Sequence, residues 1–220
     1  MPERLRENRD LVRARIADAA ARSGRAPAEV TLVCVTKTVE PALVEQLHAL
    51  GERDFAENRV QVAEPKIAAL PLAGARWHFI GHLQRNKVKS ALAVCRILHS
   101  VDSLRLAESI AAHAGDTPVD VFLEIKTSTE ESKLGLSMDE APAVIDGIRG
   151  LSGLNLRGFM TMAPYCPDPA DARPFFAALR EFRDRMRRMT GLPLPDLSMG
   201  MSNDFGIAIE EGATLVRVGS

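Results

Sequence analysis

Short apolar runs alternate with amphipathic stretches along almost the whole chain, and this alternation limits the possible folds more than any other feature. The apolar runs have the length and β-branched character of buried strands, and the stretches between them have helical spacing. Strands are predicted at residues 31–35, 54–56, 77–80, 96–101, 119–125, 156–162, 196–199 and 214–218. Helices are predicted at residues 42–50, 60–70, 86–94, 104–114, 138–148 and 173–189. This order indicates an α/β protein with a parallel sheet.

Eight such strands are the number that closes a (β/α)8 barrel of the TIM type, and 220 residues lie near the short end of its size range. Leu5, Val12 and Ile16 recur at helical spacing before Gly24, which predicts an extra N-terminal helix. The loops are short, so we expect residues 1–220 to form a single domain. The alternative is an open doubly wound sheet, which is disfavoured because no G-x-G-x-x-G motif follows the first strand.

The bulk composition excludes several classes of function. The net charge is −1, so no overall field attracts nucleic acid or a membrane surface. No apolar stretch approaches the roughly 20 residues of a membrane span, and the charged N-terminus does not resemble a secretory signal. Cys34, Cys95 and Cys166 are widely separated, and the histidines lack metal-ligand spacing. We therefore expect a cytoplasmic protein without a metal site or disulfides.

Lys37 stands at the end of the first predicted strand. Side chains alternate across a strand, so Val33, Val35 and Lys37 should share one face. The strand would then deliver one amine at its C-terminal tip, beside two core valines. A lysine desolvated in that position has a depressed pKa and can act as a nucleophile. The alternative is a surface lysine that marks the return of the chain to solvent.

Small residues follow the last two predicted strands. Gly200 and Ser202 come after the seventh strand, and Gly219 and Ser220 come after the eighth. Barrels often hold a phosphate with these two loops, because backbone N–H groups can approach an anion closely there. Ser202 or Asn203 is also predicted to cap a short helix that ends near residue 211. The alternative is an ordinary turn and helix cap.

Arg217 is the remaining unusual residue of the last strand. Alternation places it on the face opposite Val216 and Val218, so it should point into the barrel mouth, where a guanidinium needs a partner. A lysine, a phosphate cup and an inward arginine together fit pyridoxal 5′-phosphate (PLP), an aldehyde that forms a Schiff base with lysine. An arginine at the ring nitrogen disfavours its protonation, which makes the cofactor a weaker electron sink.

Several motifs extend this interpretation to a family. The chain contains V-C-V-T-K-T, F-A-E-N-R-V-Q, W-H-F-I-G-H-L-Q-R-N-K, E-E-S-K-L-G, S-M-G-M-S-N-D and V-R-V-G-S. From about residue 31 to residue 220 it resembles the single-domain PLP-binding homeostasis proteins, which are related to the barrel domain of alanine racemase. Three departures stand out: Ala56 replaces a usual Gly, Lys126 replaces a usual Asn, and relatives generally continue with a short I-F-G-like segment after the position of Ser220.

The resemblance implies a complete set of cofactor contacts. It implies that Lys37 carries the Schiff base, that Arg217 faces the pyridine nitrogen, and that Asn58 and His78 line the pocket near the ring. It also implies that the phosphate is held by Ser202, Gly219 and Ser220 with the backbone around Met199 and Gly200. A monomer is the family expectation.

The resemblance favours a protein that binds PLP and keeps its level in balance, without efficient turnover. PLP-dependent apoenzymes or amino acids are its expected partners. The sequence fits this reading because Tyr165 is the only tyrosine and no second domain supplies another acid or base. Three alternatives remain open: a low-efficiency PLP-dependent amino-acid racemase, a class I aldolase in which Lys37 attacks a sugar-phosphate ketone, and a purely structural protein.

Overall fold

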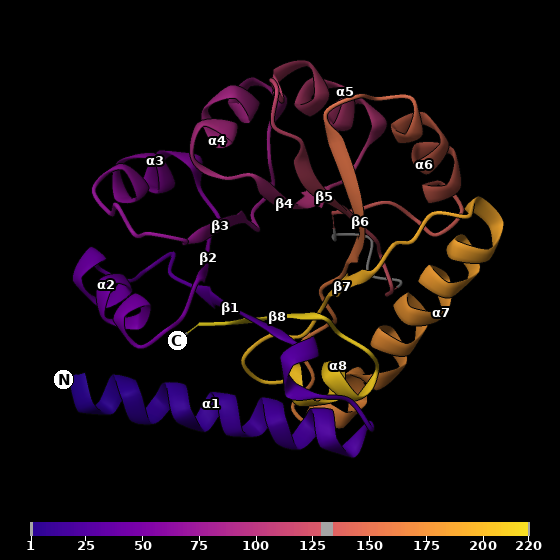
Figure 1. The fold of residues 1–220 in the computed structure, drawn as a ribbon. Coiled ribbons are helices and arrows are strands. Elements are labelled where there is room, and N and C mark those ends of the chain that lie inside the picture. Colours follow the sequence, from indigo (N-terminus) through magenta and orange to yellow (C-terminus); the bar gives the residue numbers. More distant parts are fainter. Residues whose placement is uncertain (1, 129–133, 220) are drawn as a thin grey trace.

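Eight parallel strands close into a barrel in the computed structural model, which describes residues 2–128 and 134–219 (Figure 1). The strands are β1 (Thr31–Val35), β2 (Asp54–Glu57), β3 (Arg76–Phe79), β4 (Ile97–Val101), β5 (Val119–Glu124), β6 (Leu154–Met160), β7 (Asp196–Ser198) and β8 (Leu215–Val218). Each strand pairs with the next one in the chain, and β8 pairs with β1. The predicted (β/α)8 barrel is therefore confirmed.

Helices surround the barrel, as Figure 1 shows. The α-helices are α1 (Pro2–Arg22), α2 (Pro41–Ala49), α3 (Val60–Ala68), α4 (Val88–Val94), α5 (Leu104–His113), α6 (Ala141–Arg149), α7 (Arg173–Thr190) and α8 (Phe205–Glu210). Short 3-10 turns, η1 (Pro27–Glu29), η2 (Arg85–Lys87) and η3 (Pro169–Ala172), precede β1, α4 and α7. The extra N-terminal helix is present as α1, which lies along the barrel beside α8.

The side chains of the strands form two layers. The outer layer packs between the barrel and the helices and includes Leu32, Phe55 and Phe159, all of them buried. The inner layer fills the barrel with the apolar side chains of Val33, Ala56, Phe122, Met160 and Leu215. Strand alternation accounts for the division, because neighbouring residues of one strand point to opposite faces. Val33 pairs with Arg217 in register, so inner positions of β1 and β8 lie side by side.

One irregularity interrupts the sheet between β5 and β6. The register shifts between Val121 and Phe122, and Gly158 lies opposite the shift with a φ of 152°. A Cβ atom on Gly158 would collide with the carbonyl oxygen of Asp196 on β7. Only glycine fits both this backbone angle and this close approach. The glycine therefore lets β6 and β7 pair closely where β7 begins.

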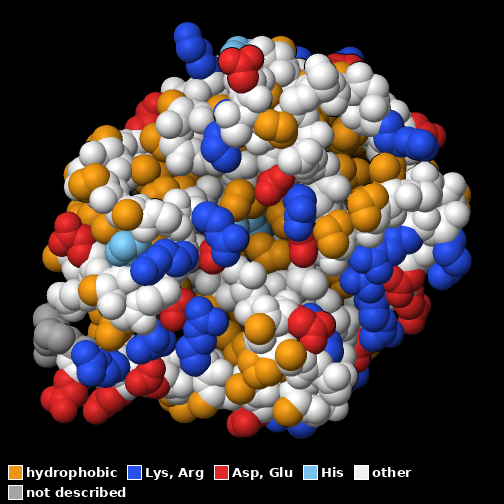
Figure 2. Space-filling view, viewed as in Figure 1, with side chains coloured by type: hydrophobic (Ala, Val, Ile, Leu, Met, Phe, Trp, Pro, Cys, Tyr) orange, Lys and Arg blue, Asp and Glu red, His pale blue; other side chains and the backbone are white. Residues whose placement is uncertain are grey.

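Charged side chains of both signs are interspersed on the face drawn in Figure 2, where they also surround a central hollow. This distribution agrees with the net charge of −1. Within the described part of the chain, no helix has the length and apolar character needed to cross a membrane.

Candidate functional site

Lys37 lies just beyond β1 and is exposed to solvent. The strand ends at Val35, and a turn closed by the Val39 N–H and the Thr36 carbonyl follows it. The turn interrupts the alternation on which the prediction rested, so the desolvation expected for Lys37 is not found. Val33 and Val35 do pack in the inner layer of the barrel, and the exposed amine follows them at the C-terminal end of β1.

A buried ion pair supports the chain immediately before Lys37. The ammonium of Lys66 on α3 donates to Glu57 Oε1 at 2.8 Å and to the Thr36 carbonyl at 2.6 Å. The Thr36 hydroxyl donates to the same Glu57 oxygen at 2.7 Å, and its N–H donates to the Ala56 carbonyl. Because Glu57 is fully buried, the three groups stabilise one another in a low-dielectric environment. Thr36, which directly precedes Lys37, is therefore held by contacts with both β2 and α3.

The two glycine–serine loops meet at the same end of the barrel. The Ser202 hydroxyl lies 3.3 Å from both the N–H and the carbonyl oxygen of Gly219. A Cβ on Gly219 would lie 3.2 Å from the Val35 carbonyl oxygen, so the last strand passes close to the end of β1. The structure thus brings Ser202 and Gly219 together and places both near the strand end that leads to Lys37. Ser220 lies outside the described residues.

Gly200 makes the turn between β7 and α8 possible. Its φ is 92°, and a Cβ there would lie 2.6 Å from the Cβ of Ala208 on α8. The carbonyl of Gly200 accepts a hydrogen bond from the Arg217 N–H at 3.0 Å, which ties this loop to β8. Met199 is fully buried in the outer layer, so only its backbone could serve a ligand.

The predicted helix cap is wrong. Helix α8 begins at Phe205 and its N-cap residue is Asp204, whose Oδ1 accepts a hydrogen bond from the Met201 N–H at 2.6 Å. Ser202 instead contacts Gly219, and the Asn203 amide donates to the Cys166 carbonyl at 3.1 Å. The Asp204 carboxylate thus folds back over its own loop and pairs with the Met201 N–H.

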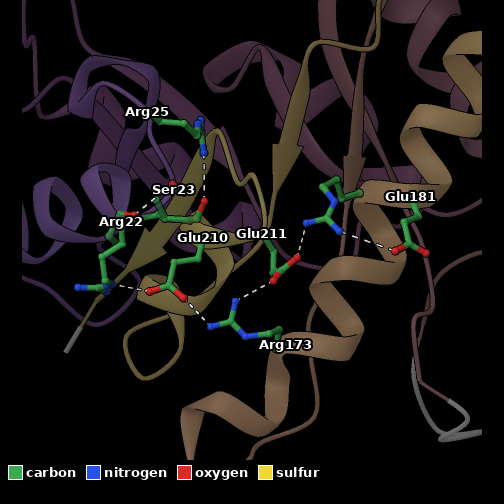
Figure 3. Close-up of polar contacts among 10 residues, drawn as sticks. Arg22, Ser23, Arg25, Arg173, Glu181, Glu210 and Glu211 are labelled. Atoms are coloured by element: carbon green, nitrogen blue, oxygen red, sulfur yellow. Dashed lines mark hydrogen bonds and ion pairs between the residues drawn. The ribbon is translucent and has the colours of Figure 1, made fainter.

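A network of ion pairs holds α8 against α1 and α7, as Figure 3 shows. Arg22 of α1 contacts Glu210 at 2.7 Å. Arg173 of α7 contacts Glu210 and, at 2.7 Å, Glu211, which also contacts Arg180. Arginines from two helices, α1 and α7, therefore fix the short helix that follows the Gly200 loop.

Arg217 points into the barrel, as alternation predicted, and is 4% exposed. Its Nη1 donates to the Ser198 carbonyl at 2.9 Å and to the Ser198 hydroxyl at 2.6 Å, and its Nη2 donates to the Thr161 carbonyl at 3.0 Å. Burial lowers the pKa of the guanidinium to about 10, although the carboxylates of Glu124 and Asp204 act in the opposite direction. The side chain stays charged at neutral pH and is held by β6 and β7.

Asn58 and His78 occupy different depths. Asn58 is half-buried after β2, where its backbone lies against Gly81 at the end of β3. His78 is 1% exposed within β3, and its imidazole contacts Asp54 and His99 inside the barrel. Asn58 thus lies with the strand-end loops, while His78 belongs to the inner layer.

The sequence analysis did not single out Glu124, which ends β5 and is 4% exposed. Burial, followed by repulsion from Asp102, raises its pKa to about 7, although Arg217 and Lys126 act in the opposite direction. Glu124 and Lys126 line a cavity of about 390 Å³ together with Thr161. The available signal was an acidic residue at an inward position of an apolar strand, which Asp120 shares.

The site is therefore an amine at the end of β1, two glycine-containing loops that meet at a serine, and an inward guanidinium. No group of three or more His, Cys, Asp or Glu residues suited to a metal occurs in residues 2–128 and 134–219. An exposed amine can attack an aldehyde, and glycine-rich loops can accept a phosphate. These residues fit a phosphorylated aldehyde such as PLP.

Comparison with known proteins agrees with this class of site. The family described as "Alanine racemase, N-terminal domain" matches residues 8–220. Proteins named pyridoxal phosphate homeostasis protein are 40% identical over 98% of this chain and 93% of theirs in Pseudomonas aeruginosa, and 43% identical over 94% and 95% in Deinococcus radiodurans. The structure of PipY from Synechococcus elongatus PCC7942 with PLP bound has 35% identity and a TM-score of 0.82, over 93% of this chain and 97% of that one.

The fold and site thus define a barrel of the alanine racemase N-terminal type. The chain belongs to that family and, within it, to the group of pyridoxal phosphate homeostasis proteins.

Proposed function

We propose that this chain binds PLP at the C-terminal end of the barrel, as a Schiff base on Lys37, and acts in PLP homeostasis. PLP supplies a reactive aldehyde when it is bound. Lys37 would provide the amine, and Arg217 would face the ring nitrogen. Ser202, Gly219 and Ser220, with the backbone around Met199 and Gly200, would hold the phosphate, while Asn58 and His78 would lie toward the ring.

The observation that carries this proposal is the meeting of Ser202 with Gly219 beside the end of β1. The Ser202 hydroxyl is 3.3 Å from the Gly219 N–H, and Gly219 approaches Val35, two residues before Lys37. One ligand with an aldehyde and a phosphate can reach both the amine and the loops only if they lie at the same end of the barrel. The names of the relatives and the PLP bound to PipY support the same choice.

The homeostasis role is favoured over a low-efficiency racemase, because the relatives that match nearly the whole chain carry the homeostasis name. Tyr165, the candidate second acid or base, is 82% exposed and so is poorly placed to hold a proton at a defined position. We propose a cytoplasmic monomer that exchanges PLP with PLP-dependent apoenzymes or amino acids.

The test is an absorbance titration of the purified protein with PLP, followed by borohydride reduction and peptide mapping. The wild type should develop the visible band of a PLP imine and carry a pyridoxyl group on Lys37. Lys37→Ala should lose both, whereas Lys89→Ala, which changes an exposed lysine of α4, should keep both. An unmodified Lys37 peptide after reduction, or a band that survives Lys37→Ala, would overturn the proposed attachment.

A further inference from the structure

A continuous set of hydrogen bonds crosses the barrel interior from β8 to β2. Arg217 Nη1 lies 2.6 Å from Ser198 Oγ, which lies 2.7 Å from His99 Nδ1. His99 Nε2 lies 2.9 Å from His78 Nδ1, and His78 Nε2 lies 2.9 Å from Asp54 Oδ1. All five residues are buried, with exposures of 6% or less. We call them the barrel chain.

The carboxylate at the far end determines the direction of the bond from His78. Burial alone would raise the pKa of the Asp54 carboxyl, but the hydrogen bonds from His78 and Arg76 hold it below its usual value. Asp54 is therefore ionised and can only accept, which places a proton on Nε2 of His78. With His78 accepting at Nδ1, His99 donates from its own Nε2.

His99 and Ser198 extend the set of hydrogen bonds to Arg217. Burial, the largest cause, keeps the pKa of His99 well below its ordinary value, so this imidazole is neutral. With His99 protonated on Nε2, its Nδ1 accepts the proton of the Ser198 hydroxyl, whose oxygen accepts from Arg217. Because a guanidinium only donates, the donor–acceptor order is the same at every link from Arg217 to Asp54.

We propose that His99 and His78 are positioning residues that fix Arg217 in the barrel mouth by linking its guanidinium, through Ser198, to the Asp54 carboxylate. The proposal deepens the proposed function, because it takes Arg217 as the group that faces the PLP ring. It assigns no proton transfer: each imidazole acts as a rigid donor–acceptor bridge, with Nε2 as the donor. Phe122 stacks on His99 with a ring-centroid distance of 4.7 Å and keeps the imidazole plane from turning.

The first test needs no cofactor. Long-range ¹H–¹⁵N NMR of the wild-type protein without PLP should show both His78 and His99 as the Nε2–H tautomer, with slowly exchanging imidazole protons, from pH 6 to pH 8. An Nδ1–H tautomer or a doubly protonated ring for either residue in this range would overturn the proposed chain. This result stands whether or not PLP binds to Lys37.

The second test uses variants and PLP. His99→Leu removes both bridges, whereas His99→Gln keeps one acceptor and one donor; His113→Leu, at the exposed end of α5, is the matched control. We expect His99→Leu to weaken PLP binding about tenfold and to shift the absorbance maximum of the bound cofactor, and His99→Gln to restore most of both. A folded His99→Leu protein with wild-type affinity and spectrum would refute the positioning role. Failure of the wild type to bind PLP would instead refute the proposed function.

Discussion

Glu124 has the most unusual environment of the acidic residues at the barrel mouth. Its pKa is raised to about 7, mainly by burial, so the folded protein keeps a proton that the unfolded chain releases near pH 4.5. Stability contributed by this proton is complete below pH 4.5 and is lost as the pH rises through 7. Ionised Glu124 would reduce the free energy of unfolding by at most about 3 kcal/mol above that range.

The corresponding prediction concerns Glu124→Gln, which keeps the shape but cannot ionise. We expect it to raise the free energy of unfolding by up to about 3 kcal/mol at pH 8 and to change it little at pH 4.5. Urea denaturation of the PLP-free protein at both pH values measures this difference. Glu108→Gln, on the exposed face of α5, serves as the control. An equal effect of Glu124→Gln at both pH values would contradict the assigned titration.

At the scale of elements, one glycine in α8 and one in the loop before it should respond to alanine substitution with opposite changes in stability. Gly200→Ala should destabilise the protein by about 2–3 kcal/mol, because φ is 92° and a Cβ would lie 2.6 Å from Ala208. Gly206→Ala lies inside α8, where the nearest atom to a new Cβ is 4.0 Å away, and should stabilise by about 0.5–1 kcal/mol. Denaturant titration of both variants tests the contrast, which fails if the two changes have the same sign.

Helix α8 also depends on its ion pairs with α7. Glu211 has a 10% exposed side chain and contacts Arg173 and Arg180, so Glu211→Gln should destabilise by about 1–2 kcal/mol. Glu181 is 72% exposed and lies 3.7 Å from Arg180, so Glu181→Gln should change stability by less than about 0.5 kcal/mol. Thermal unfolding at low and at 1 M salt distinguishes them. Similar losses in the two variants would show that burial does not set the strength of these pairs.

At the scale of the whole molecule, the cysteines report on global unfolding. Cys34 and Cys95 are buried, and burial, the largest cause, raises the pKa of each thiol to about 12. Cys166 is half-buried in the loop after β6. A thiol reagent should therefore label Cys166 first in the native protein and label all three cysteines only in denaturant. Rapid native labelling of Cys34 or Cys95 would show that the outer layer opens locally.

The sequence predicted the fold well because its information is local and repeated eight times. Hydrophobic periodicity located every strand of the barrel, with shifts of one or two residues at the ends. Alternation also placed Arg217 correctly in the interior, because Val216 and Val218 fix the faces of β8. These predictions needed only residues that are neighbours in the chain.

Site features that depend on distant residues were not predictable in this way. Lys37 is exposed because β1 ends at Val35 and a turn follows, which the apolar run did not indicate. The role of His99 was not predictable, because its partner Ser198 is 99 residues away in the chain. The raised pKa of Glu124 likewise depends first on burial in the closed barrel and then on Asp102, which follows β4. Closure of the barrel brings these groups together.

The two histidines at the centre of the barrel have a consequence for how such a protein can change over generations. In the proposed order each ring accepts from one neighbour and donates to the other, so loss of either leaves a buried polar group without its partner. A homologue that lacks one of these histidines should therefore lack both, or carry in its place a residue with the same pair of hydrogen-bonding groups. We therefore expect substitutions at His78 and His99 to occur together.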